Sequence, residues 1–202
     1  MVGRDVLFGV LLGIVHVGLF TLFDYLSLRI GSPKFAFFSL SQLSGFRAFS
    51  NLIAVELFDK VQGALILFLT LFLLRALLKR QWLAAVTWVT AYTVLNVAFS
   101  NPGPYPAYLY VALLRTLLYS AVVFIMLRFG FFALVVMLFV IDSFVGTFFT
   151  TDFSAWYGQS SLAVVILVSA MALWGFRLAL AGRPLFAPAA LAYPEGVQRP
   201  MA

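Results

Sequence analysis

The chain contains no cysteine and only one histidine among its 202 residues. Disulfide bonds, thiolate metal sites and cysteine nucleophiles are therefore excluded. Charged residues are also scarce: they make up 10% of the chain, whereas soluble domains carry about 25%. Hydrophobic residues make up 64%, and the mean hydropathy is +1.07. A water-soluble fold could not bury so much apolar surface, so we predict a multi-span membrane protein.

The motifs that carry most enzyme chemistry are also missing from the sequence. It has no His-Glu-x-x-His zinc motif, no Gly-rich phosphate loop and no well-placed Ser/His/Asp set. The paired glutamates and histidines of CPBP-type intramembrane proteases do not occur either. We therefore predict a protein without enzymatic activity, and the sequence requires no metal and no cofactor.

Long unbroken apolar runs select helices rather than a barrel, because each span must satisfy its own backbone hydrogen bonds in lipid. The predicted fold is an all-α integral membrane protein, a bundle of about six transmembrane helices. It forms a single domain over residues 1–181, followed by a Pro-rich tail over 182–202. The predicted spans cover residues 6–23, 61–78, 82–99, 107–127, 131–149 and 162–180.

Residues 24–60 form the one long connection between the predicted spans. The sequence GSPK at 31–34 is typical of a turn. Residues 45–60 are predicted to be helical, with Glu56 and Lys60 spaced as an i,i+4 ion pair. The sequence leaves open whether this helix lies in the membrane interface or extends the second span.

The distribution of basic residues predicts how the chain is oriented. Lys and Arg follow the second, fourth and sixth spans, whereas the connections after the third and fifth spans contain none. By the positive-inside rule both termini are expected to be cytoplasmic and the long connection extracytoplasmic. The net charge of +6 is assigned to helix ends and lipid headgroups rather than to nucleic acid. Aromatic residues at span ends are interpreted as interface anchors, namely Trp82, Tyr105, Trp156 and Tyr157.

Two charged residues, Arg115 and Asp142, lie inside the fourth and fifth spans, which are joined by the short turn 128–130. Counted from this turn at about 1.5 Å per residue, both lie about 20 Å along their helices. An unpaired charge in a bilayer costs at least about 2.5–3.5 kcal/mol, so we predict an ion pair. Asn96, about 21 Å into the third span, is predicted to share this polar layer.

The polar layer and His16 each have a structural and a functional interpretation. The layer is interpreted as a network that fixes helix register, with a small-solute or ion pathway as the alternative. Gly9 and Gly13 form a small-residue face for close helix approach, and His16 projects from that face near the midplane. His16 is interpreted as a hydrogen-bonded interhelical residue, with a ligand or proton-relay role as the alternative.

Four short strings resemble the multi-pass membrane module that follows the kinase domain in some bacterial serine/threonine protein kinases. They are GRDV at 3–6, RFG at 128–130, TDFSAWY at 151–157, and GF followed by LAGRPLF within 175–186. The kinase part itself is missing: there is no Gly-rich loop, no His-Arg-Asp and no Asp-Phe-Gly. The module has no defined function, so the resemblance implies no catalytic residues.

We therefore predict a non-enzymatic scaffold or accessory subunit of a larger complex in the bacterial cytoplasmic (inner) membrane. Its expected partners are the lipid bilayer and other membrane subunits. The small-solute or ion pathway remains the first alternative. The second is a pigment- or quinone-binding subunit of an energy-converting complex, because the numerous Phe side chains could surround a lipid, quinone or pigment.

Overall fold

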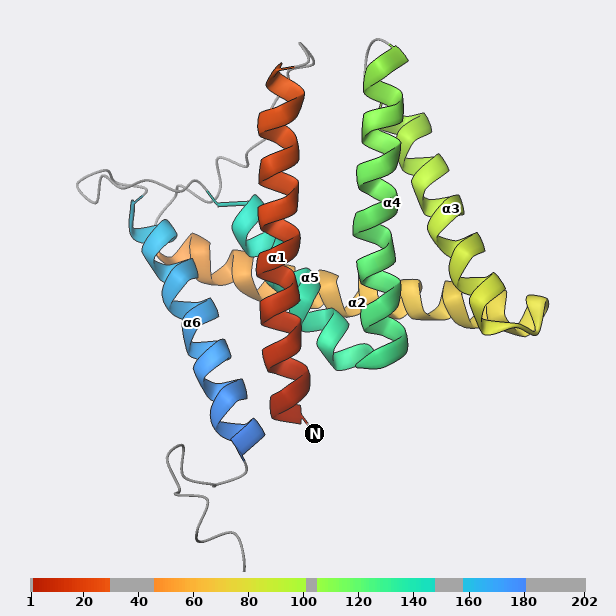
Figure 1. Ribbon diagram of the computed structural model, residues 1–202. Coiled ribbons are helices and arrows are strands. Elements are labelled where there is room, and N and C mark those ends of the chain that lie inside the picture. Colours follow the sequence, from red (N-terminus) through yellow and green to blue (C-terminus); the bar gives the residue numbers. More distant parts are fainter. Residues whose placement is uncertain (1, 30–45, 101–104, 148–157, 181–202) are drawn as a thin grey trace, which may run out of the picture.

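The computed structural model describes residues 2–29, 46–100, 105–147 and 158–180 (Figure 1). Within these ranges the chain is helical and contains no strand. The helices are α1 (Val2–Arg29), α2 (Phe46–Leu78), α3 (Gln81–Ser100), α4 (Tyr105–Arg128), α5 (Phe131–Val145) and α6 (Gly158–Leu180). The predicted all-α class is thus confirmed for the described part of the chain, whereas the tail over 182–202 lies outside it.

Five of these helices are long and apolar enough to cross a membrane, which is compatible with a multi-pass membrane protein. The exception is α5, which has 15 residues and is therefore about 22 Å long, shorter than a hydrocarbon layer of about 30 Å. It corresponds to the predicted span over residues 131–149, of which the last two residues lie outside the described ranges. The expected count of six spans stays a prediction.

The helix α2 is continuous over 33 residues, so residues 46–60 extend the second predicted span instead of forming a separate helix. It runs across the direction of α1 and α4 in the view of Figure 1. It ends where Lys79 adopts a left-handed conformation with φ 56, and the Lys79 N–H donates to the Arg75 carbonyl at 2.9 Å. This bond is typical of a helix C-terminus and allows α3 to start two residues later.

The short helix α5 lies at the centre of the molecule. Eight of its 15 residues are buried, and six of these belong to the two parts of the hydrophobic core. In one part, Leu134 and Met137 of α5 pack with residues of α2, α3 and α4, including Trp88. In the other, Val136 and Val140 pack with valines of α1 and α6. The remaining helices are thus arranged around α5.

Two glycines of α1 allow this helix to approach α5 closely. A Cβ atom at Gly9 would lie 2.8 Å from the carbonyl oxygen of Ala133, and one at Gly13 would lie 2.9 Å from Cβ of Val140. Both separations are shorter than a normal van der Waals contact, so a side chain larger than hydrogen does not fit. The predicted small-residue face is therefore confirmed, and the structure identifies α5 as the helix that packs on it.

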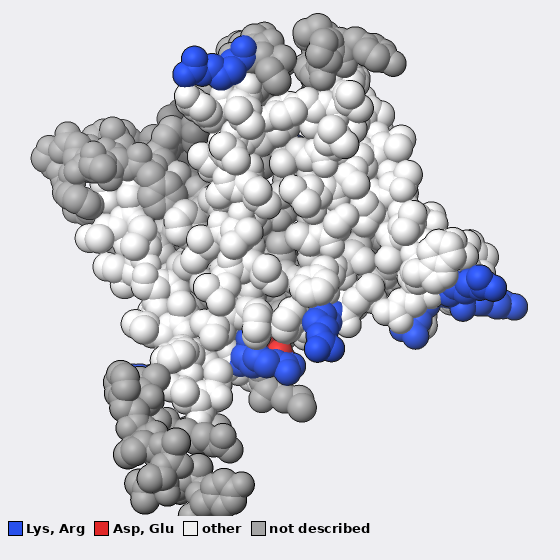
Figure 2. Space-filling view, viewed as in Figure 1, with Lys and Arg blue, Asp and Glu red and all other residues white. Residues whose placement is uncertain are grey.

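Charged residues on the face shown in Figure 2 gather at its edges. Lys and Arg side chains lie at the top, along the bottom and where α2 meets α3, and a broad uncharged band separates top from bottom. Many large side chains in the apolar helices are exposed, including Leu69, Phe72 and Leu113. Such a surface is stable in contact with lipid and would be unstable in water.

Gly130 is one of the two residues between α4 and α5, and its substitution tests the geometry of this turn. It has φ 89 and ψ −168, a combination that only glycine adopts readily. A Cβ atom there would have no neighbour within 4 Å, so an added methyl group affects only the backbone. We expect Gly130→Ala to lower the free energy of unfolding by about 1–2 kcal/mol, measured by SDS titration in mixed micelles.

Gly63→Ala is the matched control for this substitution. Gly63 lies inside α2, and a Cβ atom there would also have no neighbour within 4 Å. Because alanine favours a helix over glycine by up to about 1 kcal/mol, this variant should be neutral or slightly stabilised. If Gly130→Ala and Gly63→Ala changed the free energy of unfolding equally, Gly130 would not need its positive φ.

Candidate functional site: ionisable residues between α1, α2, α4 and α5

Asp142 of α5 forms an ion pair with Lys60 of α2. The sequence analysis expected Arg115 as the partner of Asp142, and the structure differs because α2, not α4, brings a basic side chain to this part of α5. The side chain of Lys60 is 22% exposed and that of Asp142 is 41% exposed. Lys60 also does not bridge to Glu56, its expected i,i+4 partner, within the described part of the chain.

Arg115 lies instead against α1. Its guanidinium carbon is 5.9 Å from the centre of the Phe20 ring, a cation–π geometry. About one turn further along, the same helices meet again, because the rings of Phe23 and Tyr110 stack at 4.3 Å and the Tyr110 hydroxyl donates to the Phe23 carbonyl at 3.3 Å. The buried Nε of Arg115 has no hydrogen-bond partner among the described residues. Arg115 thus anchors α4 to α1 rather than to α5.

His16 of α1 is half-buried and lies within range of the charges of both Arg115 and Asp142. Its buried Nδ1 has no hydrogen-bond partner within the described ranges. Glu56 of α2 lies within range of the charges of Asp142 and Lys60. Ionisable residues of four helices therefore gather around one part of the interior, although only Lys60 and Asp142 make a direct ion pair there.

The remaining predicted residues are less closely tied to this cluster. Asn96 is half-buried on α3, one turn beyond Thr93, whose hydroxyl lies 3.5 Å from that of Thr116 on α4. Trp82 is 60% exposed at the start of α3, a position that suits an interface anchor. Tyr105 begins α4, but its side chain, like residues 156 and 157, lies outside the described part. The interface and polar-layer assignments stay predictions.

The cluster contains residues that the sequence analysis did not assign to it. Lys60 and Glu56 were interpreted only as partners of each other, and Phe20 received no role. Their position in a long apolar helix was the available signal, because Lys60 falls inside the apolar segment Ile53–Leu78. An ionisable residue inside such a segment needs a partner from a neighbouring helix. In the described residues no group of three or more His, Asp or Glu is arranged to hold a metal ion.

Comparisons of the chain with protein-family models, curated proteins and solved structures find no match. The resemblance to the kinase-associated membrane module therefore stays a prediction.

Proposed function

We propose that this protein is a non-enzymatic integral membrane scaffold or accessory subunit of a larger membrane complex. The observation that supports this most is the ion pair between Lys60 and Asp142, which joins α2 to α5. Two charges that neutralise each other across helices restrict how those helices pack and leave little reactivity. The ionisable groups of the interior then serve to assemble the bundle.

The contact between Arg115 and Phe20 supports the same role. It places the charge of Arg115 against an aromatic face, where the attraction is about 0.5–2 kcal/mol, and links α4 to α1. The two contacts thus join α2 to α5 and α4 to α1. In keeping with the sequence analysis, we place the protein in a bacterial inner membrane with cytoplasmic termini.

The test of this proposal uses native membranes extracted into copolymer nanodiscs without detergent. Blue-native electrophoresis should show the 22.4 kDa chain in a band well above monomer size, together with at least one co-purifying membrane protein. Heating the same sample in SDS should return the chain to monomer size. A native band at monomer size without a co-purifying protein would contradict the proposed role.

A proton or ion pathway is the second candidate function, favoured by the gathering of His16, Glu56 and Arg115 around the Lys60–Asp142 pair. Intramembrane ionisable residues often mark such pathways. Purified protein in liposomes that contain a pH-sensitive dye would decide between the two candidates. A pathway predicts proton flux that Asp142→Asn abolishes and Arg4→Gln, outside the cluster, leaves unchanged. A scaffold predicts the flux of empty liposomes for all three proteins.

A further inference from the structure

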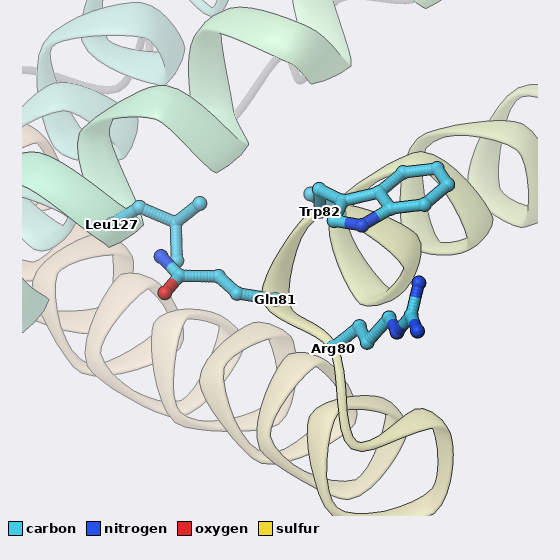
Figure 3. A pocket seen from close by; sticks show the side chains of 5 residues that line it. Arg80, Gln81, Trp82 and Leu127 are labelled. Carbon is cyan, nitrogen blue, oxygen red and sulfur yellow. The ribbon is translucent and has the colours of Figure 1, made fainter.

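A groove follows the contact between α3 and α4 and begins at the start of α3. Its first part has a volume of about 620 Å³ and is lined by Arg80, Gln81, Trp82, Ala85 and Leu127 (Figure 3). In that view the Gln81 side chain extends toward Leu127 of α4, and Arg80 lies below Trp82. This part therefore has polar and basic groups on the α3 side and an aliphatic wall on the α4 side.

The second part of the groove has a volume of about 420 Å³ and adjoins the first, because Ala85 lines both. It also contains Val89, Thr90 and Phe124. Phe124 and Leu127, one from each part, lie three residues apart and so share a face of α4. The two parts adjoin as one open groove along α3 and α4, and the volume of each lies within the range of ligand sites, about 300–1,000 Å³.

The second part of the groove is mostly apolar, although three hydroxyl groups line it, and two of them, on α4, bond to their own helix. The Thr116 hydroxyl donates to the Ala112 carbonyl at 2.8 Å, and the Ser120 hydroxyl donates to the Thr116 carbonyl at 2.7 Å. Both hydroxyl protons are therefore used within α4 itself and are not offered to a ligand. The groove thus has one basic side chain, Arg80, at its mouth, and no charged side chain lines its second part.

The mouth of the groove carries a concentration of positive charge. Arg75, Lys79 and Arg80 lie within six positions of the sequence, and no Asp or Glu occurs between Asp59 and Asp142. None of the three forms an ion pair within the described part of the chain, and Figure 2 shows basic side chains gathered where α2 meets α3. The partial positive charge at the N-terminus of α3 is offset by the partial negative charge at the C-terminus of α2, so the positive charge of this region comes from the three side chains. An external anion can neutralise it.

We propose that the groove binds an anionic phospholipid, with the phosphodiester at Arg80 and Gln81 and one acyl chain along α3 and α4. A membrane phospholipid combines a charged phosphate with an apolar chain, which matches a basic residue next to an apolar lining. The indole of Trp82 lies at the boundary between the two, where tryptophan is favoured at membrane interfaces. A zwitterionic lipid supplies no net negative charge and binds more weakly at the basic mouth.

The test exposes the full chain in micelles to equal amounts of phosphatidylglycerol and phosphatidylcholine, and native mass spectrometry reads the retained lipid. Wild-type protein should prefer phosphatidylglycerol, and Arg80→Gln should reduce this preference about fivefold, as expected for one basic residue near a lipid surface. Thr90→Phe, which fills the groove from an exposed position, should reduce retention of both lipids.

Two controls separate binding in the groove from general attraction to the membrane surface. Arg177→Gln removes an exposed charge on α6, and Val94→Phe adds a ring on α3 beyond the groove lining, where Val94 is 60% exposed. Both variants should retain the same amount of lipid as wild type, with the same preference for phosphatidylglycerol. The proposal is overturned if Arg80→Gln has no more effect than Arg177→Gln. It is also overturned if Thr90→Phe has no more effect than Val94→Phe, because the lipid would then lie only on the outer surface.

Discussion

Gly9→Val is expected to lower the free energy of unfolding by about 3 kcal/mol, the upper end of the usual cost of overpacking. A Cβ atom at Gly9 would lie 2.8 Å from the carbonyl oxygen of Ala133 and 2.9 Å from Cβ of Val136. A carbonyl oxygen belongs to the backbone, so it moves only if the whole of α5 moves. Because α5 contributes to both parts of the core, that movement disturbs every helix around it. SDS titration of the purified variant in mixed micelles measures the loss.

Gly18→Val is the matched control, since it makes the same substitution in the same helix. A Cβ atom at Gly18 would have no neighbour within 4 Å, so the change should stay within about 0.5 kcal/mol. If the two variants lost equal stability, the loss could not come from the close approach of Gly9 to Ala133. The close contact between α1 and α5 would then have no energetic role.

Lys60→Met is expected to lower the free energy of unfolding by about 2–3 kcal/mol, because the Asp142 carboxylate loses its ion-pair partner inside an apolar bundle. Breaking a fully buried pair costs about 3–5 kcal/mol, and we expect less here because the two side chains are 22% and 41% exposed. The double variant Lys60→Met/Asp142→Leu removes both charges and should recover part of the loss. The coupling between the two positions should exceed about 0.5 kcal/mol.

A second double-mutant cycle tests the ion pair between Arg115 and Asp142 that the sequence predicts. Arg115→Met and Asp142→Leu should be additive within about 0.5 kcal/mol, because Arg115 lies against Phe20 of α1. Strong coupling of Arg115 with Asp142, together with additivity of Lys60 with Asp142, would reverse the assignment. It would restore the ion pair between the fourth and fifth helices.

Much of the helical architecture could be predicted from the sequence, since apolar runs and turn residues mark the helix positions locally. The α3 bounds Gln81–Ser100 differ from the predicted 82–99 by one residue at each end. The turn predicted at 128–130 is found between α4 and α5, with Gly130 directly before α5. Helix length was less predictable where polar residues continue a helix: α1 extends to Arg29, beyond the predicted span 6–23, whereas the helix predicted over 45–60 is present and is continuous with the second span in α2. Apolar content indicates where lipid lies and not where a helix ends.

The candidate site was less predictable, because depth along a helix does not determine which neighbour a side chain faces. Arg115 and Asp142 were placed at equal depth from the turn, yet α5 packs most extensively against α1. The Gly9 and Gly13 spacing indicated a packing face but could not name α5 as its partner. Lys60 could be found only once α2 was known to cross α5, since that crossing depends on tertiary packing.

The most direct test of the account is a thiol cross-link between α2 and α5, which is straightforward because the chain contains no cysteine. The pairs Lys60→Cys/Asp142→Cys and Arg115→Cys/Asp142→Cys would be compared in native membranes with one short bis-thiol reagent. Cleavage at an engineered protease site between the two positions would then show whether the fragments remain joined. We predict that the fragments stay joined for the pair at positions 60 and 142 and separate for the pair at 115 and 142. The opposite pattern would contradict the arrangement of α2 and α4 around α5.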